Sequence, residues 1–394
     1  MDSTLDTLLQ QQLAALDATH RRRRLRALSW VGGQLQDASG RILIDASSND
    51  YLGLSQHPLV KARAAEWAER HGGGAPASRL VTGTRDITLA VEEKLAAFKG
   101  CEAALLFSSG FQANATVIPA LTRVGAGDTA IFSDALNHAS IVHGCRTART
   151  KTQVFRHNDL EHLEDLLRRH AGKPGRKMIL TESVFSMDGD RADLPALVQL
   201  AERHGAALYV DEAHASGVLG PGGRGLAAEC GGVDIVMGTL GKAFGAFGAY
   251  IAGSRTLIDY LVNCCPGFIY TTALPPAVLG AVDAALDLVP GMDGERERLA
   301  RNSQRLRDAL ALRNYDTLAS STQIIPAVIG SEEDALAAAQ RLEEAGVLAV
   351  AIRPPTVAAG TSRLRLTLSS ALDEEDMRQL LDAVATSLPL RPQD

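Results

Sequence analysis

Residues 207–214, ALYVDEAH, and residues 234–242, DIVMGTLGK, decide the fold. Each stretch begins with a short apolar run and continues into charged residues or glycine. Continuous apolar runs that end in this way are typical of strands buried on both faces. We therefore predict two core strands, with Asp211, His214 and Lys242 just beyond or at their ends.

The same pattern extends outward over residues 100–255. Short apolar runs recur there, and segments with helical periodicity separate them. The runs are Ala103–Phe107, Thr129–Phe132, Thr152–Phe155, Lys177–Leu180, Ala207–Val210, Asp234–Met237 and Gly248–Ala252. Strands that alternate with helices indicate βαβ units and a mainly parallel sheet covered on both faces. The predicted fold class is α/β, and functional residues are expected in the loops at the carboxyl ends of the strands.

The chain as a whole is predicted to have three parts. Residues 1–46 are expected to form an arginine-rich helical arm and a hairpin centred on Asp37–Arg41, and residues 47–285 a large domain. Residues 286–394 are expected to form a linker helix and a small C-terminal α/β domain. The helical linking segment, Ala281–Leu312, is interrupted at Pro290-Gly291. The strands expected after it are Gln323–Ile329, Leu348–Ile352 and Ser362–Leu368, with helices that begin after Ser331 and near Asp373.

Composition excludes several classes of function. The 394 residues carry a net charge of -6, and the one basic run, Arg21–Arg24, is too short to predict a nucleic-acid-binding surface. No apolar stretch approaches the length of about 20 residues that spans a bilayer, and the N-terminus lacks the apolar core of a signal peptide. The five cysteines are odd in number and show no CxxC spacing, so neither a disulfide framework nor a zinc site is expected. We predict a cytoplasmic protein without a bound metal.

Lys242 is the first candidate for chemistry. It follows a core strand and has small neighbours, so that a planar aldehyde cofactor can approach its amine and form an imine. Taken alone, it is equally compatible with an ordinary loop lysine. Thr239 and Lys242 also match a Thr-x-x-Lys pattern, but threonine stands in the place of the nucleophilic serine and no partner motif appears.

Asp211 and His214 favour pyridoxal 5'-phosphate (PLP) as that cofactor. PLP accepts electrons only while its pyridine nitrogen is protonated, and a buried carboxylate such as Asp211 raises the basicity of that nitrogen. His214, one helical turn later, can hydrogen-bond the phenolic oxygen of the ring. The structural alternative is a helix N-cap at Asp211 and an interior histidine at position 214. The lysine 31 residues after Asp211 favours the cofactor.

Polar residues at other strand ends add a predicted phosphate site. Gly110 and Phe111 open a helix directly after a strand, where free backbone amides bind phosphate. Hydroxyl groups nearby are predicted from Thr239, Thr271 and Thr272, and His138 is placed to stack on the ring; each of these alone also fits an ordinary turn or cap. Residues 220–225, GPGGRG, match GxGxxG but do not lie between a strand and a helix, so a loop is expected there.

These segments together resemble the α-oxoamine synthases, PLP enzymes of fold type I that condense an amino acid with an acyl-CoA thioester and release CO2. The likeness extends from about Leu16 to Leu388. The matching segments are Ser47–Leu54, Ser78–Gly83, Ser186–Asp190, Asp211–His214, Thr239–Lys242, Ile352–Val357 and Gly360–Arg365, while Pro76 and Ala358 depart from the family pattern. Within the family, the chain looks most like the acyltransferase of biotin biosynthesis, which joins L-alanine to pimeloyl-CoA or a pimeloyl-carrier protein.

The resemblance implies a role for each candidate residue. Around the cofactor it implies Lys242 as the Schiff-base lysine, Asp211 at the pyridine nitrogen, His214 and Ser186 at the ring oxygen, His138 stacked on the ring, and Gly110, Phe111 and Thr239 at the phosphate. For the substrates it implies Arg365 at the amino-acid carboxylate and Asn49, Thr356 and an arginine of the N-terminal run, Arg22, facing the acyl chain. It also implies a homodimer in which Thr271 and Thr272 reach into the phosphate site of the neighbouring subunit.

Two alternatives stay open at the level of sequence. One is another α-oxoamine synthase, such as 2-amino-3-ketobutyrate CoA ligase, 5-aminolevulinate synthase or serine palmitoyltransferase, because these enzymes share the ring-binding residues. The other is a non-catalytic subunit on the same fold. The presence of Lys242, Asp211, His214 and Arg365 together argues against the second.

Overall fold

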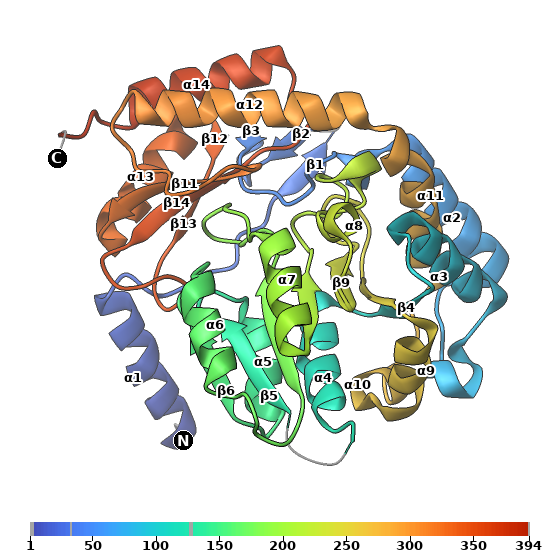
Figure 1. The fold of residues 1–394 in the computed structure, drawn as a ribbon. Coiled ribbons are helices and arrows are strands. Elements are labelled where there is room, and N and C mark those ends of the chain that lie inside the picture. Colours follow the sequence, from blue (N-terminus) through green and yellow to red (C-terminus); the bar gives the residue numbers. More distant parts are fainter. Residues whose placement is uncertain (1–3, 32–33, 126–128, 393–394) are drawn as a thin grey trace. The chain divides into compact units, whose positions relative to one another are not determined.

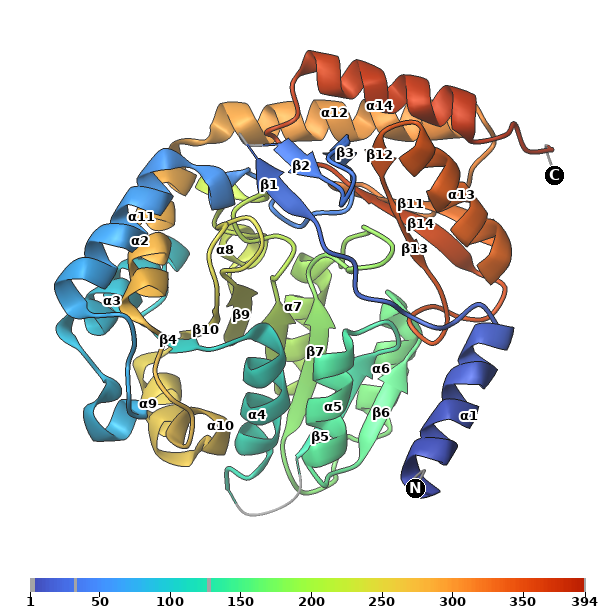
Figure 2. The same ribbon diagram turned by 180° about the vertical axis from the view of Figure 1, so that it is seen from behind.

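The computed structural model describes residues 4–31, 34–125 and 129–392, and the chain divides into two compact units. Unit 1 comprises Met1–Ser48, Met187–Asp190 and Arg298–Asp394, and unit 2 comprises Asn49–Ser186 and Arg191–Glu297 (Figures 1 and 2). The three parts expected, with boundaries after residues 46 and 285, differ from these two units: unit 1 also contains Met187–Asp190, and unit 2 extends to Glu297. The first residues fold with the last ones, because strand β3 (Ile42–Asp45) pairs with strand β12 (Val347–Leu348).

A seven-stranded sheet forms the centre of unit 2 (Figure 1). Its order is β4 (Ala103–Phe107), β10 (Ala249–Gly253), β9 (Ile235–Thr239), β8 (Ala206–Asp211), β7 (Lys177–Glu182), β5 (Ala130–Asp134) and β6 (Thr152–Phe155). The pairs from β9 to β6 are parallel, whereas β10 runs antiparallel to both β4 and β9. The mainly parallel α/β sheet is therefore confirmed, and each predicted apolar run of this region overlaps a strand.

Apolar side chains fill both faces of this sheet. Along β8, Tyr209 belongs to one apolar cluster, whereas Leu208 and Val210 belong to the other. The first cluster includes side chains of α4 (Gly110–Thr122), α5 (Ala139–Thr147), α9 (Arg255–Cys264) and α10 (Pro266–Ile269), and the second those of α6 (Leu160–Arg168), α7 (Leu194–His204) and α8 (Ala227–Cys230). Burial on both faces explains why the strand sequences are continuously apolar.

The rest of unit 2 consists of helices and short turns. Helix α2 (Pro58–His71) packs against α11 (Pro276–Leu288) through Val60, Ala281 and Ala284. The other elements are α3 (Asp86–Lys99), a 3-10 turn at Leu54–Gln56, a π-helical turn at Arg79–Gly83 and a 3-10 turn at Pro221–Gly223. The 3-10 turn Pro221–Gly223 lies within the GPGGRG stretch, and turns and bends rather than a strand come directly before it. The expectation of a loop there is therefore confirmed. In the described part of the chain, no helix is both long and apolar enough to cross a bilayer.

Unit 1 contains two small sheets. Strands β11 (Ile324–Gly330), β14 (Ser362–Thr367) and β13 (Val350–Ile352) form an antiparallel sheet, and β1 (Ser29–Val31), β2 (Gln34–Gln36), β3 and β12 form the other. The single strand predicted at Leu348–Ile352 is wrong, because the chain changes sheets at Ala349. The Ser47 hydroxyl holds this break by donating to Leu348 O at 3.2 Å and accepting from Val350 N at 3.0 Å.

The helices of unit 1 correct a second prediction. Helix α1 (Thr4–Ala18) contains no arginine, and the run Arg21–Arg26 follows it without helical structure. In a helix these arginines would stack like charges at spacings of three and four residues, whereas the observed path lets them reach separate acids. These ion pairs are Arg21–Glu332, Arg22–Asp17 and Arg26–Glu343.

The other predicted features of unit 1 agree with the structure. Strands β2 and β3 form the expected hairpin, whose turn is closed by a hydrogen bond from Asp37 N to Arg41 O at 3.1 Å. The linking helical segment, which leads from unit 2 into unit 1, is broken as expected, by a 3-10 turn at Val289–Gly291 between α11 and α12 (Asp293–Ala311). Helices α13 (Glu332–Glu344) and α14 (Glu374–Ser387) begin at the N-caps Ser331 and Asp373.

Candidate active site

The candidate site lies at the carboxyl ends of the strands in unit 2. Asp211 is the last residue of β8, Glu182 the last of β7 and Thr239 the last of β9. Asp211 and Glu182 are paired in the register of the sheet. Because parallel strands end at the same edge, the fold gathers residues that are far apart in the sequence.

Lys242 and His214 are in direct contact at this edge. The Lys242 Nζ atom lies 2.9 Å from His214 Nε2. The other ring nitrogen, Nδ1, lies 2.6 Å from the hydroxyl of Tyr51, which also donates to Asn49 Oδ1 at 3.0 Å. The sequence predicted the proximity of Lys242 and His214 but assigned no role to Tyr51, whose side chain is fully buried.

Asp211 is buried and held on both carboxylate oxygens. Its Oδ2 accepts from Asn114 Nδ2 at 2.8 Å, and its Oδ1 accepts from Ala213 N at 2.8 Å. Asn114, on α4, is itself fixed by a hydrogen bond from the Tyr209 hydroxyl at 2.7 Å. Asp211 thus stabilises the turn that follows it, but no helix begins there, so the N-cap that the structural alternative expected is absent. Helix α4 also orients Asp211, through Asn114. A rigidly held carboxylate of this kind suits a protonated ring nitrogen.

His138 caps helix α5 beside these groups. Its Nδ1 atom lies 2.7 Å from Ser140 Oγ, and its backbone N–H donates to Glu182 Oε1 at 2.5 Å. Burial lowers the pKa of the imidazole, the Asp211 carboxylate opposes this, and Lys242 lowers the pKa further. A neutral imidazole is therefore favoured, which suits the predicted stacking on a cofactor ring.

Glu182 is a member of this cluster that sequence reasoning missed. Its side chain is buried, and burial together with the Asp211 carboxylate raises its pKa well above the usual range. A carboxylic acid at the end of a core strand was the available signal, the same one that identified Asp211. Ser186 follows four residues later and is also buried, and Ser183 N donates to Asp211 O at 2.9 Å, so that this segment runs beside the end of β8.

The start of α4 is the place predicted for the phosphate of the cofactor. A Cβ atom added to Gly110 would lie 2.7 Å from Thr239 Cγ2, so the helix start and Thr239 are in close contact. Ser109 is the N-cap, and its hydroxyl accepts from Gln112 N at 3.2 Å. The side chain of Phe111 is half exposed and its ring contacts that of His143. Gly110 and Thr239 are thus brought together as predicted, and free amides at a helix start can bind a phosphate group.

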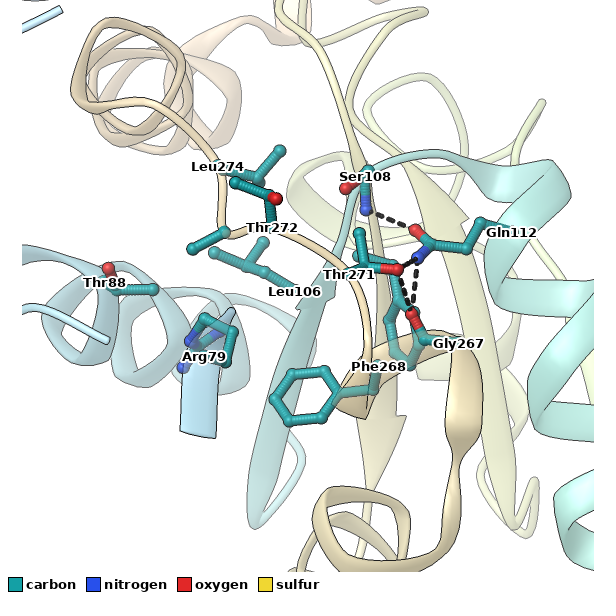
Figure 3. Close-up of a pocket in the computed structure, with 12 residues that line it drawn as sticks. Arg79, Thr88, Leu106, Ser108, Gln112, Gly267, Phe268, Thr271, Thr272 and Leu274 are labelled. Atoms are coloured by element: carbon teal, nitrogen blue, oxygen red, sulfur yellow. Dashed lines mark hydrogen bonds between the residues drawn. The ribbon is translucent and has the colours of Figure 1, made fainter. Parts of the chain in front are cut away.

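Thr271 and Thr272 lie in a pocket next to the same helix (Figure 3). Gln112 Nε2 donates to Thr271 Oγ1 at 2.7 Å, and its Oε1 accepts from Ser108 N at 2.8 Å. Thr271 Oγ1 in turn donates to Gly267 O at 2.6 Å. Figure 3 shows Gln112 directed from α4 toward Thr271 and Gly267. Within its own chain Thr271 is therefore hydrogen-bonded to helix α4, and its reach into a neighbouring subunit stays a prediction.

Of the predicted substrate residues of unit 1, Arg365 lies on β14, Thr356 in the loop before it, and Arg22 in the segment after α1. Arg365 lies buried in β14, the central strand of its sheet. Arg363, two residues earlier, pairs with Asp188 of the segment Met187–Asp190. Thr356 accepts from Arg23 Nη2 at 3.2 Å, whereas Arg22 pairs with Asp17. The structure therefore brings Arg23, rather than the expected Arg22, to Thr356.

Comparison with known proteins identifies the family of the chain. The family model described as aminotransferase class I and II matches residues 41–384. The chain is 59% identical over 387 residues to a putative 8-amino-7-oxononanoate synthase of Bordetella pertussis, with 97% of each chain covered. It is 54% identical over 383 residues to the 8-amino-7-oxononanoate synthase of Gluconacetobacter diazotrophicus, with 96% of each chain covered.

A solved structure of similar fold is SPT with a PLP internal aldimine, which matches with a TM-score of 0.86 at 29% identity and with 98% of each chain covered. The family model spans most of the chain, and the named relatives match it along nearly its whole length. The chain therefore belongs to the aminotransferase class I and II family and, within it, to the 8-amino-7-oxononanoate synthases.

Proposed function

We propose that the chain is a PLP-dependent acyltransferase that condenses L-alanine with a pimeloyl thioester, pimeloyl-CoA or a pimeloyl-carrier protein. The products are 8-amino-7-oxononanoate, the free thiol and CO2. The observation that carries the proposal is the contact between Lys242 and His214, 2.9 Å apart, at the sheet edge where Asp211 ends the neighbouring strand. Relatives at 59% and 54% identity that carry this enzyme's name support the assignment.

The residues of unit 2 fit PLP. Gly110 leaves beside Thr239 a space that a Cβ would fill, Asp211 presents a fixed carboxylate, and Lys242 presents an amine. When bound to such a lysine, PLP supplies an electron sink for the α-carbon of an amino acid. The amides at the start of α4 would hold its phosphate, Asp211 its pyridine nitrogen, and His214 and Ser186 its ring oxygen.

The chain's own groups then have distinct tasks. With PLP held in the site, the amine of Lys242 would take the α-proton of alanine and later return a proton. The guanidinium fork of Arg365 would bind the alanine carboxylate with two hydrogen bonds. Asn49, Thr356 and an arginine of the N-terminal run would face the acyl chain, and the contact of Arg23 with Thr356 favours Arg23 over Arg22.

A product assay separates this function from its sister activities. The purified protein with PLP and pimeloyl-CoA is given alanine, glycine or serine in turn, and the amino ketone is identified by mass spectrometry. Alanine is expected to give the fastest product formation and Lys242→Ala none. Faster product formation from serine or glycine would assign the chain to another α-oxoamine synthase activity. A protein that binds PLP on Lys242 but forms no amino ketone from any amino acid and acyl-CoA would be the non-catalytic subunit.

The proposal includes a homodimer. The bridge between Ser78 and Thr272 joins two segments that expose apolar side chains: Leu80, Val81 and Tyr270 are 54%, 74% and 83% exposed. Exposed apolar groups gathered beside a functional pocket are typical of a surface that another chain covers.

The proposal also places the enzyme in the cytoplasm. The five cysteines form no disulfide, which is consistent with a protein of the reducing cytoplasm.

A further inference from the structure

The hydroxyl of Tyr51 points to a role for this residue in the function proposed above. We propose that Tyr51 is a positioning residue. It orients His214 and determines whether the hydrogen of the imidazole lies on Nδ1 or on Nε2, the nitrogen that faces Lys242. Tyr51 precedes the 3-10 turn Leu54–Gln56 and is 163 residues away from His214 in the sequence. Its side chain is fully buried in unit 2.

The contact between Tyr51 and His214 is made at the edge of the imidazole. The hydroxyl lies 2.6 Å from Nδ1, and the ring centroids are 6.0 Å apart at an interplanar angle of 49°, so the rings do not stack. The opposite nitrogen, Nε2, is 2.9 Å from Lys242 Nζ. The imidazole thus connects the Tyr51 hydroxyl to the amine that is proposed to bind the cofactor.

The positions of the hydrogens follow from what each group can donate. A neutral imidazole has one N–H and one acceptor nitrogen, and an ammonium group can only donate. With Lys242 as the donor, Nε2 must accept, so the hydrogen of His214 lies on Nδ1 and is donated to the Tyr51 oxygen. The Tyr51 hydroxyl then donates to Asn49 Oδ1 at 3.0 Å, and the chain of hydrogen bonds is complete.

The direction must reverse when His214 faces the ring oxygen of PLP. That oxygen is an acceptor, so Nε2 must carry the hydrogen and Nδ1 must accept one. A phenol hydroxyl serves both states because it turns from acceptor to donor by rotation about one bond, whereas a phenylalanine side chain serves neither. Tyr51 therefore keeps a buried imidazole nitrogen hydrogen-bonded in both tautomers, which otherwise costs free energy.

The other titratable groups at this edge have partners of their own. Asp211 accepts from Asn114 and Ala213, and Glu182 accepts from the His138 backbone. The His138 ring contacts Ser140. The two nitrogens of His214 contact the Tyr51 hydroxyl and the Lys242 amine.

The test replaces Tyr51 by phenylalanine and uses Tyr250→Phe as the matched control. Tyr250 is also fully buried, and its hydroxyl lies 2.7 Å from Ser216 Oγ rather than on His214. Nuclear magnetic resonance of protein labelled with 15N-histidine reports the tautomer of His214 with and without PLP, assigned by its loss in His214→Gln. We expect hydrogen on Nδ1 without PLP and on Nε2 with PLP in the wild-type protein and in Tyr250→Phe.

In Tyr51→Phe we expect the His214 signals to lose this switch, and kcat to fall about 10- to 100-fold, the range seen when the hydrogen-bond partners of metal-bound histidines are removed. The alanine KM should change much less, because Tyr51 is not placed at the amino acid.

Unchanged His214 signals and kcat in Tyr51→Phe would overturn the proposal. A His214 hydrogen on Nε2 in the PLP-free wild-type protein would overturn it as well. This measurement needs no variant, so it is valid even if Tyr51→Phe does not fold. Failure of the wild-type protein to form product would instead refute the proposed function, since the PLP-free tautomer is read without turnover.

Discussion

The first single residue to test is Arg365 of strand β14. A lysine at this position keeps the charge but loses the planar fork that binds a carboxylate at two points. Loss of one hydrogen bond to a charged group is worth about 1.5–3 kcal/mol, so Arg365→Lys should raise the alanine KM about 10- to 100-fold. The PLP content should stay normal, because the cofactor contacts proposed here come from other residues.

Arg363→Lys is the matched control for this substitution. Arg363 lies on the same strand and is similarly buried, but its guanidinium pairs with Asp188. Steady-state kinetics with alanine should show a much smaller rise in KM for Arg363→Lys. An equal rise in both variants would show that β14 is merely disturbed, and an unchanged KM in Arg365→Lys would remove Arg365 from the carboxylate site.

Glu182 gives the site a pH dependence of stability. Burial raises the pKa of this carboxyl in the folded chain, so it keeps its proton at pH values where the unfolded chain, with a pKa of about 4.3, loses it. Its contribution to stability is complete below that value and is lost as the pH rises toward the folded pKa. Glu182→Gln cannot titrate and keeps an oxygen for the His138 N–H.

The free energy of unfolding of the holoenzyme, measured by urea titration at a series of pH values, checks this expectation. The difference between Glu182→Gln and wild type should shift in favour of the variant as the pH rises above about 4.3. A difference that is constant over the whole range would mean that Glu182 titrates normally in the fold.

At the residue scale, the sequence predicted the side chains that lie at or just beyond the ends of core strands. Lys242, Asp211 and His214 follow apolar runs, and such runs imply a common sheet edge. Tyr51 could not be found in this way, because it lies outside the strand pattern and reaches His214 only through the tertiary fold. Glu182, like Asp211, is an acid at the end of a core strand. It was missed because the neighbouring segment, Ser186–Asp190, was identified only through the family resemblance.

Among the secondary-structure elements, the start of α4 is the one on which cofactor binding depends most directly. Gly110→Ala places a methyl group within 2.7 Å of Thr239 Cγ2, so that Thr239 or the helix start must move. Overpacking of this kind costs about 1–3 kcal/mol, which corresponds to a rise in the Kd of PLP of about 5- to 100-fold. Fluorescence titration of the PLP-free protein with PLP measures the change.

A glycine in open space provides the comparison for Gly110→Ala. Gly294 lies in the first turn of α12, and a Cβ there meets no atom within 4 Å. Gly294→Ala should leave the affinity for PLP unchanged, because alanine favours the helix and touches nothing. Wild-type affinity in Gly110→Ala would contradict the assignment of the α4 start to the phosphate.

Elements whose partners are apolar were predicted more reliably than those whose partners are polar. The core strands β4 to β10 were found because burial on both faces leaves a continuous apolar pattern. The run Arg21–Arg26 was assigned wrongly to a helix, because its ion partners Glu332 and Glu343 lie more than 300 residues away. The switch of sheets at Ala349 likewise depends on pairing with β3, which local sequence does not reveal.

For the whole molecule, assembly is the property that remains a proposal. If Thr271 and Thr272 contribute to a neighbouring phosphate site, the enzyme is a C2 dimer with a largely apolar interface of more than about 2,000 Å². PLP held by both chains should then stabilise the dimer by mass action, so that the holoenzyme stays dimeric at lower concentrations than the PLP-free protein. Sedimentation of both forms over a dilution series measures this, and an active, PLP-loaded monomer would return both threonines to ordinary turn residues.

The central claim, that Lys242 holds the cofactor at the edge of the parallel sheet, is tested most directly by chemical trapping. The holoenzyme is reduced with borohydride, digested, and the modified peptide is sequenced by mass spectrometry. The account predicts a phosphopyridoxyl group on Lys242 alone, and in Lys242→Ala bound PLP without any covalent label. A label on another lysine of the wild-type protein, or PLP that cannot be trapped at all, would contradict it.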